Sequence, residues 1–149
     1  MLQNSARVDF YVLAAADDAA RMRFACRLAE KACHLKHRIH LHTDSAGDAS
    51  ALDELLWTFR QGSFVPHEIV VLGLPARSPV TIGHGGNPPP PGDLLINLAG
   101  AVPDFAGQFT RVAEIVDGSE QGRRLGRERF RSYRERGQEP ATHNIGSNP

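Results

Sequence analysis

The sequence contains few cysteines and no long apolar run. Cys26 and Cys33 are the only cysteines among its 149 residues. On a helix they would lie about 10.5 Å apart along the axis, which is too far for a disulfide. No segment approaches the roughly 18 apolar residues that span a bilayer, and no basic, signal-peptide-like region begins the chain. We therefore expect a cytoplasmic protein that does not bind membranes.

The glycines that bind nucleotides are also missing. An α/β dinucleotide site needs glycine in the first strand-to-helix turn, so that the backbone can approach phosphates. Here that turn runs from Ala14 to Asp18 without glycine, and its two aspartates would repel a phosphate. The segment His84-Gly85-Gly86 weakly resembles an oxyanion loop, but no G-x-S-x-G nucleophile elbow accompanies it. We expect no cofactor and no catalytic residue.

Positive charge is scarce outside one segment. Residues 1–118 carry 10 basic and 13 acidic side chains, whereas residues 119–136 carry seven Arg and three Glu. Broad binding to a phosphate backbone usually needs a basic domain. The distribution predicts a local anion site and no strong direct binding of nucleic acid.

Strand-like and helix-like segments alternate along the chain. Apolar residues on both faces of residues 7–13 are typical of a central parallel strand. The expected strands are 7–13, 38–42, 68–72, 80–82, 94–98 and 112–116, and the expected helices are 17–36, 48–59, 105–109 and 119–136. This alternation predicts a three-layer α/β/α sandwich with a mostly parallel sheet, Rossmann-like but without a nucleotide-binding loop. We expect one domain over residues 1–137 and a polar, disordered tail over 138–149.

Trp57 does not fit the apolar stripe of its helix. If Leu52 is set at 0°, Leu55, Leu56 and Phe59 fall within about 60° of it, whereas Trp57 falls near 140°. The turn Phe64-Val65-Pro66-His67 follows. A covering loop could bury Trp57, or Trp57 and Phe64 could be exposed anchors for a partner protein.

The last helix carries an arginine face beside an aromatic residue. With Leu125 at 0°, Phe130 falls near 140°, and five arginines fall between about 160° and 260°. These are Arg123, Arg124, Arg127, Arg131 and Arg134. The face is either simply solvated or binds an acidic peptide or nucleic acid, because arginine recognises carboxylates and phosphates while the aromatic edge accepts an apolar group.

Four histidines raise a different possibility. His40 and His42 would share one face of a strand, with His34 and His37 just before it. No Cys or carboxylate joins them at a known metal-binding spacing, so a surface cluster without a metal is favoured. The alternative is a small α/β enzyme or a metal-binding protein that uses these histidines.

The chain resembles the chi subunit family of bacterial DNA polymerase III. The matching segments occur in family order with family spacing: Val8–Leu13, Leu52–Trp57, Phe64–His67, Asp93–Leu98 and Arg127–Arg134. The resemblance implies an α/β/α accessory subunit of DNA replication that is not itself an enzyme. It also implies two partners, the psi subunit of the clamp loader and the acidic C-terminal tail of single-stranded DNA-binding protein.

The resemblance assigns each partner a surface. The tail site would use Arg127, Phe130 and Arg131, within the face that also holds Arg123, Arg124 and Arg134. The psi surface would use Trp57, Phe64, Pro66 and His67. In the tail site Phe130 stands where the family often has Tyr, and Arg131 where Lys is common, which keeps the charge but changes its geometry.

Overall fold

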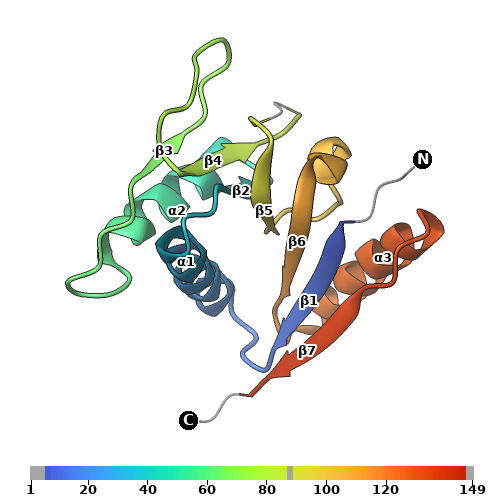
Figure 1. Ribbon diagram of the computed structural model, residues 1–149. Coiled ribbons are helices and arrows are strands. Elements are labelled where there is room, and N and C mark those ends of the chain that lie inside the picture. Colours follow the sequence, from blue (N-terminus) through green and yellow to red (C-terminus); the bar gives the residue numbers. More distant parts are fainter. Residues whose placement is uncertain (1–5, 87–88, 147–149) are drawn as a thin grey trace.

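Seven strands form one sheet in the computed structural model, which describes residues 6–86 and 89–146 (Figure 1). The strands are β1 (Arg7–Leu13), β2 (Ile39–Thr43), β3 (His67–Ile69), β4 (Val80–His84), β5 (Gly92–Asn97), β6 (Phe109–Val116) and β7 (Ala141–Ile145). Their order is β3-β4-β2-β5-β6-β1-β7, and every described pairing is parallel. The predicted parallel sheet is confirmed.

Side-chain caps begin the three α-helices. These are α1 (Asp18–His34), α2 (Ala46–Thr58) and α3 (Glu120–Glu135), and a 3-10 turn, η1, spans Asp104–Gln108. Asp17 accepts the Ala20 amide at 2.7 Å, and Ser45 and Ser119 accept the amides three residues ahead of them. Each cap satisfies an amide that has no partner inside its helix, which fixes where the helix starts.

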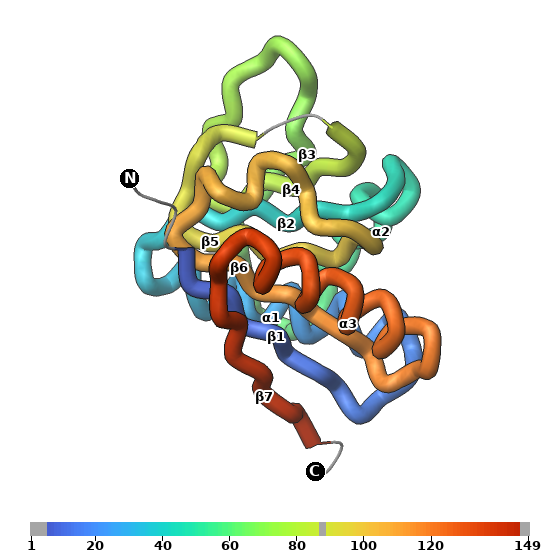
Figure 2. The backbone as a smooth tube through the Cα atoms, turned by 90° about the vertical axis from the view of Figure 1, so that its right-hand side faces the viewer, coloured from blue at the N-terminus to red at the C-terminus, as the bar shows by residue number. Residues whose placement is uncertain are grey.

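The helices cover both faces of the sheet and complete three layers. Helices α1 and α2 bury one face in a core that includes Cys26, Leu52 and Leu56. On the other face, α3 and η1 enclose a second core around Phe10 and Phe105. Figure 2 shows α3 crossing in front of the strands with β7 beside it. The α/β/α sandwich is therefore confirmed.

Strand β1 contributes side chains to the cores on both faces of the sheet, as its alternating pattern predicts. Val8 and Phe10 belong to the core under α3, whereas Tyr11 and Leu13 pack on the α1 side. Successive side chains of a strand point to opposite faces, so one strand supplies residues to two separate surfaces.

The polar tail is not disordered over most of its length, contrary to our prediction. Residues Ala141–Ile145 form β7, which pairs in parallel with β1 from Asp9↔Ala141 to Leu13↔Ile145. His143 stacks on Tyr11 with 5.0 Å between ring centroids, and its Nε2 lies 2.9 Å from Asp9. These tertiary contacts order a segment whose composition alone suggests disorder. Residues 147–149 lie outside the described part.

One strand is shorter than predicted. We expected residues 68–72 to be extended, but β3 ends at Ile69 and is followed by a turn. Val71 and Leu72 are 54% and 76% exposed, so their apolar character does not reflect a buried strand. Within residues 6–86 and 89–146, no helix is long and apolar enough to cross a membrane.

Candidate functional site

An apolar-floored groove of about 270 Å³ lies between α3 and the β1–β7 edge of the sheet. We call it the α3 groove. Phe10 and Val12 of β1, Val116 of β6 and Phe130 of α3 supply its apolar lining. The rings of Phe10 and Phe130 lie 5.2 Å apart at 55°, a tilted arrangement that favours aromatic contact. Phe130 is only partly buried, so its edge is available to a ligand.

Arginine and polar side chains form the rim of the α3 groove. Arg123 and Arg127 stand one helical turn apart on α3, and both are exposed. Thr142 and Asn144 of β7 form the opposite wall, and no acidic residue lines the groove. The groove therefore offers an apolar surface beside unneutralised positive charge.

Gly126 allows α3 to approach the sheet closely. A Cβ atom at this position would lie 3.0 Å from Cγ2 and 3.1 Å from Cγ1 of Val116. Such distances are tighter than about nine in ten real Cβ contacts, so a larger residue would require Val116 to shift by a few tenths of an ångström. The sequence analysis did not single out Gly126, Thr142 or Asn144.

The structure brings only part of the predicted arginine face to the groove. All five arginines are exposed, and none makes an ion pair with a carboxylate among the residues described. Arg123 and Arg127 line the groove, whereas Arg124, Arg131 and Arg134 do not. The last three extend the positive charge beyond it along α3.

A buried ion pair anchors α3, and the sequence analysis missed it. Nε of Arg129 donates to Glu114 of β6 at 2.7 Å, with side chains 5% and 0% exposed. The Tyr133 hydroxyl and the Asn97 amide donate to the second oxygen of Glu114. Burial, and then the nearby Glu114 carboxylate, raise the pKa of Tyr133. A glutamate in the otherwise apolar strand 112–116 was the available signal, since a buried carboxylate needs a partner.

A second surface, the Trp57 patch, consists of the exposed rings of Trp57 and Phe64. Trp57 and Phe64 are 56% and 64% exposed, and their ring centroids lie 6.0 Å apart. Of the two alternatives that the sequence left open for Trp57, burial under a loop or exposure with Phe64, the structure shows exposure. An exposed pair of this size is typical of a protein interface.

His67 lies beneath the patch. Its side chain is 0% exposed, and its ring centroid is 4.7 Å from that of Trp57. Nδ1 is 2.6 Å from the Val65 carbonyl oxygen, and Nε2 is 3.2 Å from the Asp53 carbonyl oxygen. His67 therefore supports Trp57 from below, while Pro66 beside it remains partly exposed.

An ion pair braces the loop that carries Phe64. Glu30 of α1 accepts from Arg60 and from the Ser63 hydroxyl. These hydrogen bonds lower the pKa of Glu30. They fix residues 60–63 against α1 and so place Phe64 next to Trp57.

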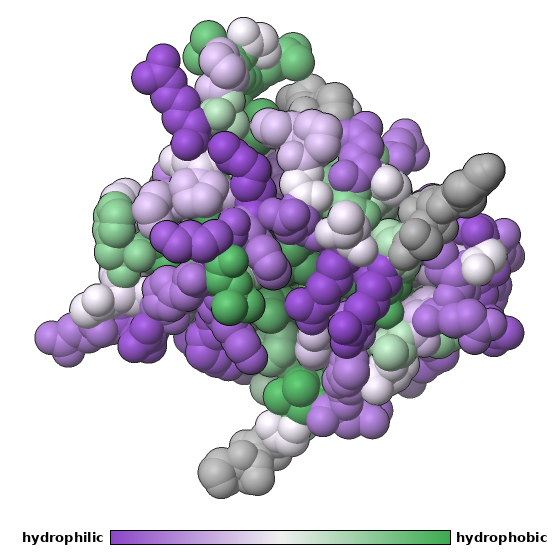
Figure 3. All heavy atoms as spheres, viewed as in Figure 1, coloured by the Kyte–Doolittle hydropathy of each residue, from purple (hydrophilic) through white to green (hydrophobic). Residues whose placement is uncertain are grey.

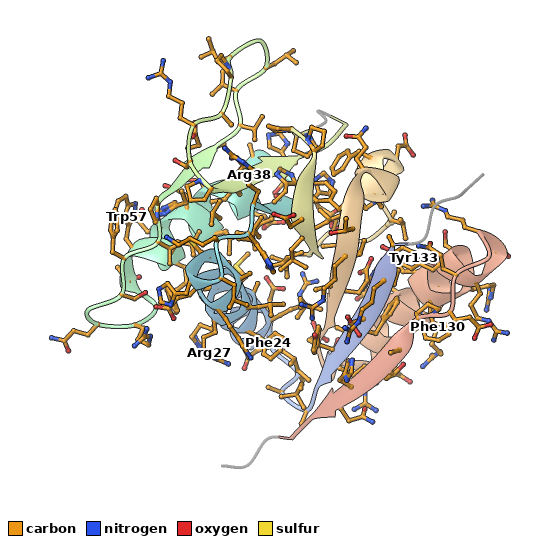
Figure 4. All side chains as sticks on the ribbon, viewed as in Figure 1. Phe24, Arg27, Arg38, Trp57, Phe130 and Tyr133 are labelled. Atoms are coloured by element: carbon orange, nitrogen blue, oxygen red, sulfur yellow. The ribbon has the colours of Figure 1, made fainter. Side chains whose placement is uncertain are left out.

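The two surfaces lie at opposite edges of the sheet. Trp57 contacts His67 of the edge strand β3, whereas the α3 groove borders the other edge strand, β7. Figure 4 shows Trp57 and Phe130 on opposite sides of the molecule. The two surfaces therefore do not overlap.

The histidines do not form the surface cluster that we predicted. His40 and His42 are 1% and 4% exposed and pack against Phe105, whereas His34 and His37 are exposed. Burial lowers the pKa of His40 to about 3 and also lowers that of His42. Nowhere in residues 6–86 and 89–146 are three or more His, Cys, Asp or Glu side chains placed to hold a metal ion.

A cavity at the carboxyl end of β2 lacks the linkage that nucleophilic catalysis needs. Thr43, His42 and Asp44 all line it. The Thr43 hydroxyl donates to the Gly83 carbonyl at 3.0 Å, and the Asp44 carboxylate accepts the Gly100 amide. Nδ1 of His42 makes no hydrogen bond in the described part. Nucleophile, base and orienting group are thus not connected.

Comparisons with known proteins agree on one family. The protein-family model described as "DNA polymerase III chi subunit, HolC" matches residues 6–141. A DNA polymerase III subunit chi of Pseudomonas aeruginosa is 44% identical over 131 residues, which is 88% of this chain and 91% of the relative. The Escherichia coli subunit chi is 31% identical over 75% of this chain and 77% of its own length, and that of Haemophilus influenzae is 29% identical over 92% and 96%.

Proposed function

The chain belongs to the DNA polymerase III chi subunit family, and on this basis we propose that it is a non-catalytic adaptor of DNA replication in the cytoplasm. It links the psi subunit of the clamp-loader assembly to the acidic C-terminal tail of single-stranded DNA-binding protein. The observation that carries the tail assignment is the α3 groove, where an apolar floor meets arginines that have no carboxylate partner among residues 6–86 and 89–146.

The groove suits an acidic peptide that ends in an apolar side chain. The terminal side chain would lie on Phe10, Val12 and Phe130, and its carboxylates would face Arg123 and Arg127. Charge-assisted hydrogen bonds to arginine are among the stronger ones in proteins. Phe130 contributes apolar contact only, because it has no hydroxyl group.

The outer arginines act at longer range. Arg124, Arg131 and Arg134 lie outside the groove lining but on the same helix. They would attract the remaining acidic residues of the tail and speed its approach, an effect that salt screens.

The psi subunit would bind the Trp57 patch at the other edge of the sheet. Trp57 and Phe64 would be the anchors, Pro66 would extend the contact, and His67 would hold Trp57 in place. An exposed aromatic pair on a free chain is a liability that a partner would cover.

A pull-down from purified components tests the tail assignment. The chain should retain single-stranded DNA-binding protein with its C-terminal tail intact and lose it when the last residues are removed. Arg127→Ala should weaken this retention. Arg23→Ala is its matched control, since Arg23 is exposed and lies outside the α3 groove. Equal retention of the truncated protein would contradict the assignment.

A further inference from the structure

A second groove, of about 320 Å³, lies on the opposite face of β1, beside α1. We call it the α1 groove. Tyr11 of β1 and Phe24 and Leu28 of α1 provide an apolar lining, and the rings of Tyr11 and Phe24 lie 5.4 Å apart. Leu35, also in the lining, is 61% exposed. Helix α1 thus has an apolar surface besides the stripe that it buries against the sheet.

Three cations surround the α1 groove. Arg27 and Lys31 stand one turn apart on α1, and both are exposed. Neither makes an ion pair with any residue in the described part of the chain. Arg111 of β6 lies on the other side and donates to Asp9 at 3.1 Å. No acidic residue lines the groove.

Positive charge outnumbers negative charge at this face. Asp9 is buried beneath it, and both Arg7 and Arg111 contact the same oxygen of its carboxylate, at 3.0 and 3.1 Å. Arg27 and Lys31 add two further cations that do not contact Asp9, so four cations face one carboxylate here, a balance of +3. In Figure 3, apolar spheres between α1 and β1 are flanked by hydrophilic ones. Figure 4 shows Phe24 and Arg27 side by side on α1.

We propose that the α1 groove is a second docking site for an acidic peptide with an apolar terminal side chain. It repeats the chemistry of the α3 groove: one apolar floor with aromatic rings, two cations one helical turn apart, and no lining carboxylate. Strand β1 contributes to both, with Phe10 on one face and Tyr11 on the other. The ligand class rests on the function proposed above, since the two grooves would hold two copies of the same kind of tail.

The geometry favours a peptide over single-stranded nucleic acid. Bases stack on aromatic faces that lie open and nearly parallel. Tyr11 already stacks on His143, at 21° between the ring planes, and Phe24 is tilted by 45° from Tyr11. The other apolar residues of the lining, Leu28, Ala32 and Leu35, are aliphatic and suit an amino-acid side chain.

Calorimetric titration with a synthetic acidic peptide ending in phenylalanine tests the proposal. The wild-type chain should bind two peptides. Arg127→Ala should weaken binding at the α3 groove and leave the α1 groove unchanged, whereas the double variant Arg27→Glu/Lys31→Glu should weaken binding at the α1 groove and leave the α3 groove unchanged. Each lost charge-assisted contact should weaken its own site about tenfold. Combining the three substitutions should weaken both sites.

Two further variants separate a local effect from a general one. Arg23→Glu changes the charge of α1 by as much as either substitution of the double variant does. Arg23 lies outside the groove lining, so both sites should remain. Arg27→Gln/Lys31→Gln removes the charges without reversing them and should also weaken the second site. Thermal melting by circular dichroism should show that both pairs of substitutions leave the fold intact.

The outcomes distinguish this proposal from the proposed function. A single peptide per chain, bound more weakly by Arg127→Ala and unaffected by Arg27→Glu/Lys31→Glu, would overturn the α1 site and leave the α3 site standing. Absence of any peptide binding would overturn both. If an oligothymidylate, rather than the peptide, binds and is lost in Arg27→Glu/Lys31→Glu, the groove is a nucleic-acid site and the proposal is wrong.

Discussion

The guanidinium of Arg129 donates a 2.7 Å hydrogen bond to the carboxylate of Glu114 between helix α3 and the sheet. Both side chains are nearly inaccessible to solvent. Because Arg129 faces inward, Arg127 and Phe130 on the same helix reach the groove above β1. A buried contact thus sets the orientation of the surface that we propose binds the acidic tail.

Removing one partner of this pair should be costly. Arg129→Met should lower the free energy of unfolding by about 3–5 kcal/mol, because Glu114 would remain buried without its cation. Adding Glu114→Gln should recover part of that loss, since the amide oxygen can still accept from Tyr133. Urea denaturation of the single and double variants measures both effects. Equal stability of Arg129→Met and wild type would show that the pair does not hold α3.

Arg127→Ala should weaken binding of an acidic, Phe-ended peptide to the α3 groove by about 1.5–3 kcal/mol, the worth of a charge-assisted hydrogen bond. The melting temperature should barely change, because Arg127 is exposed. Peptide titration by calorimetry checks the affinity, and Arg23→Ala is the control. Rising salt should weaken wild-type binding. An unchanged affinity at the α3 groove would remove Arg127 from the site.

Trp57→Ala and Phe64→Ala should each reduce affinity for the psi subunit by about 2 kcal/mol or more, as expected for interface anchors. Neither should cost the roughly 3–5 kcal/mol of stability that a buried aromatic does, because both rings are largely exposed. Surface plasmon resonance with immobilised psi subunit measures the effect. Both variants should still bind the tail peptide, and a shared loss of both partners would indicate misfolding.

Acid should weaken the attachment of β7 through Asp9. Burial opposes ionisation of Asp9, but hydrogen bonds from His143 and Arg111 and the charges of Arg7 and Arg111 outweigh it, so the pKa of Asp9 lies below its usual value. Because the pKa of Asp9 is lower in the folded than in the unfolded chain, its ionised carboxylate stabilises the fold at pH values above the ordinary aspartate pKa of about 3.9. This contribution disappears as the pH falls through the pKa that Asp9 has in the folded chain.

The variant Asp9→Asn isolates that contribution from those of other carboxylates. Its free energy of unfolding should be lower than that of wild type at pH 7, and the difference should shrink as the pH is lowered below about 4. Urea denaturation across this pH range provides the measurement. A difference that stays constant with pH would rule out Asp9 as the titrating group.

Direct DNA binding should be weak near physiological salt. Residues 1–118 carry a balance of −3, and only two or three basic side chains line each of the two grooves. A mobility-shift assay with a single-stranded oligonucleotide should show little complex with the chain alone. Tight binding that resists added salt would contradict an adaptor that reaches DNA only through another protein.

Much of the fold follows from local patterns in the sequence. The alternation in β1 separates Phe10 from Tyr11, and capping side chains begin α1, α2 and α3. The position of Trp57 off the apolar stripe of α2 and the shared face of five arginines on α3 also follow from helical periodicity, whereas the exposure of Trp57 does not. In each case, residues within about two helical turns or one strand carry the information.

Other features depend on partners that are distant in the chain. His143 lies 134 residues from the Asp9 that orders it, and a polar composition alone gave us the wrong prediction for this segment. His40 and His42 were predicted at the surface but are covered by Phe105. A local pattern does not reveal which residue the fold will place over a side chain.

The sequence by itself therefore determined the helices and most strands of this protein, the parallel sandwich and the arginines beside Phe130, because propensity, capping and periodicity act between near neighbours. Only the tertiary structure decided that β7 completes the α3 groove, that Arg129 is buried against Glu114 and that Arg27 and Lys31 border a second groove. Each of these depends on packing between elements far apart in sequence, where burial and paired charge decide the outcome.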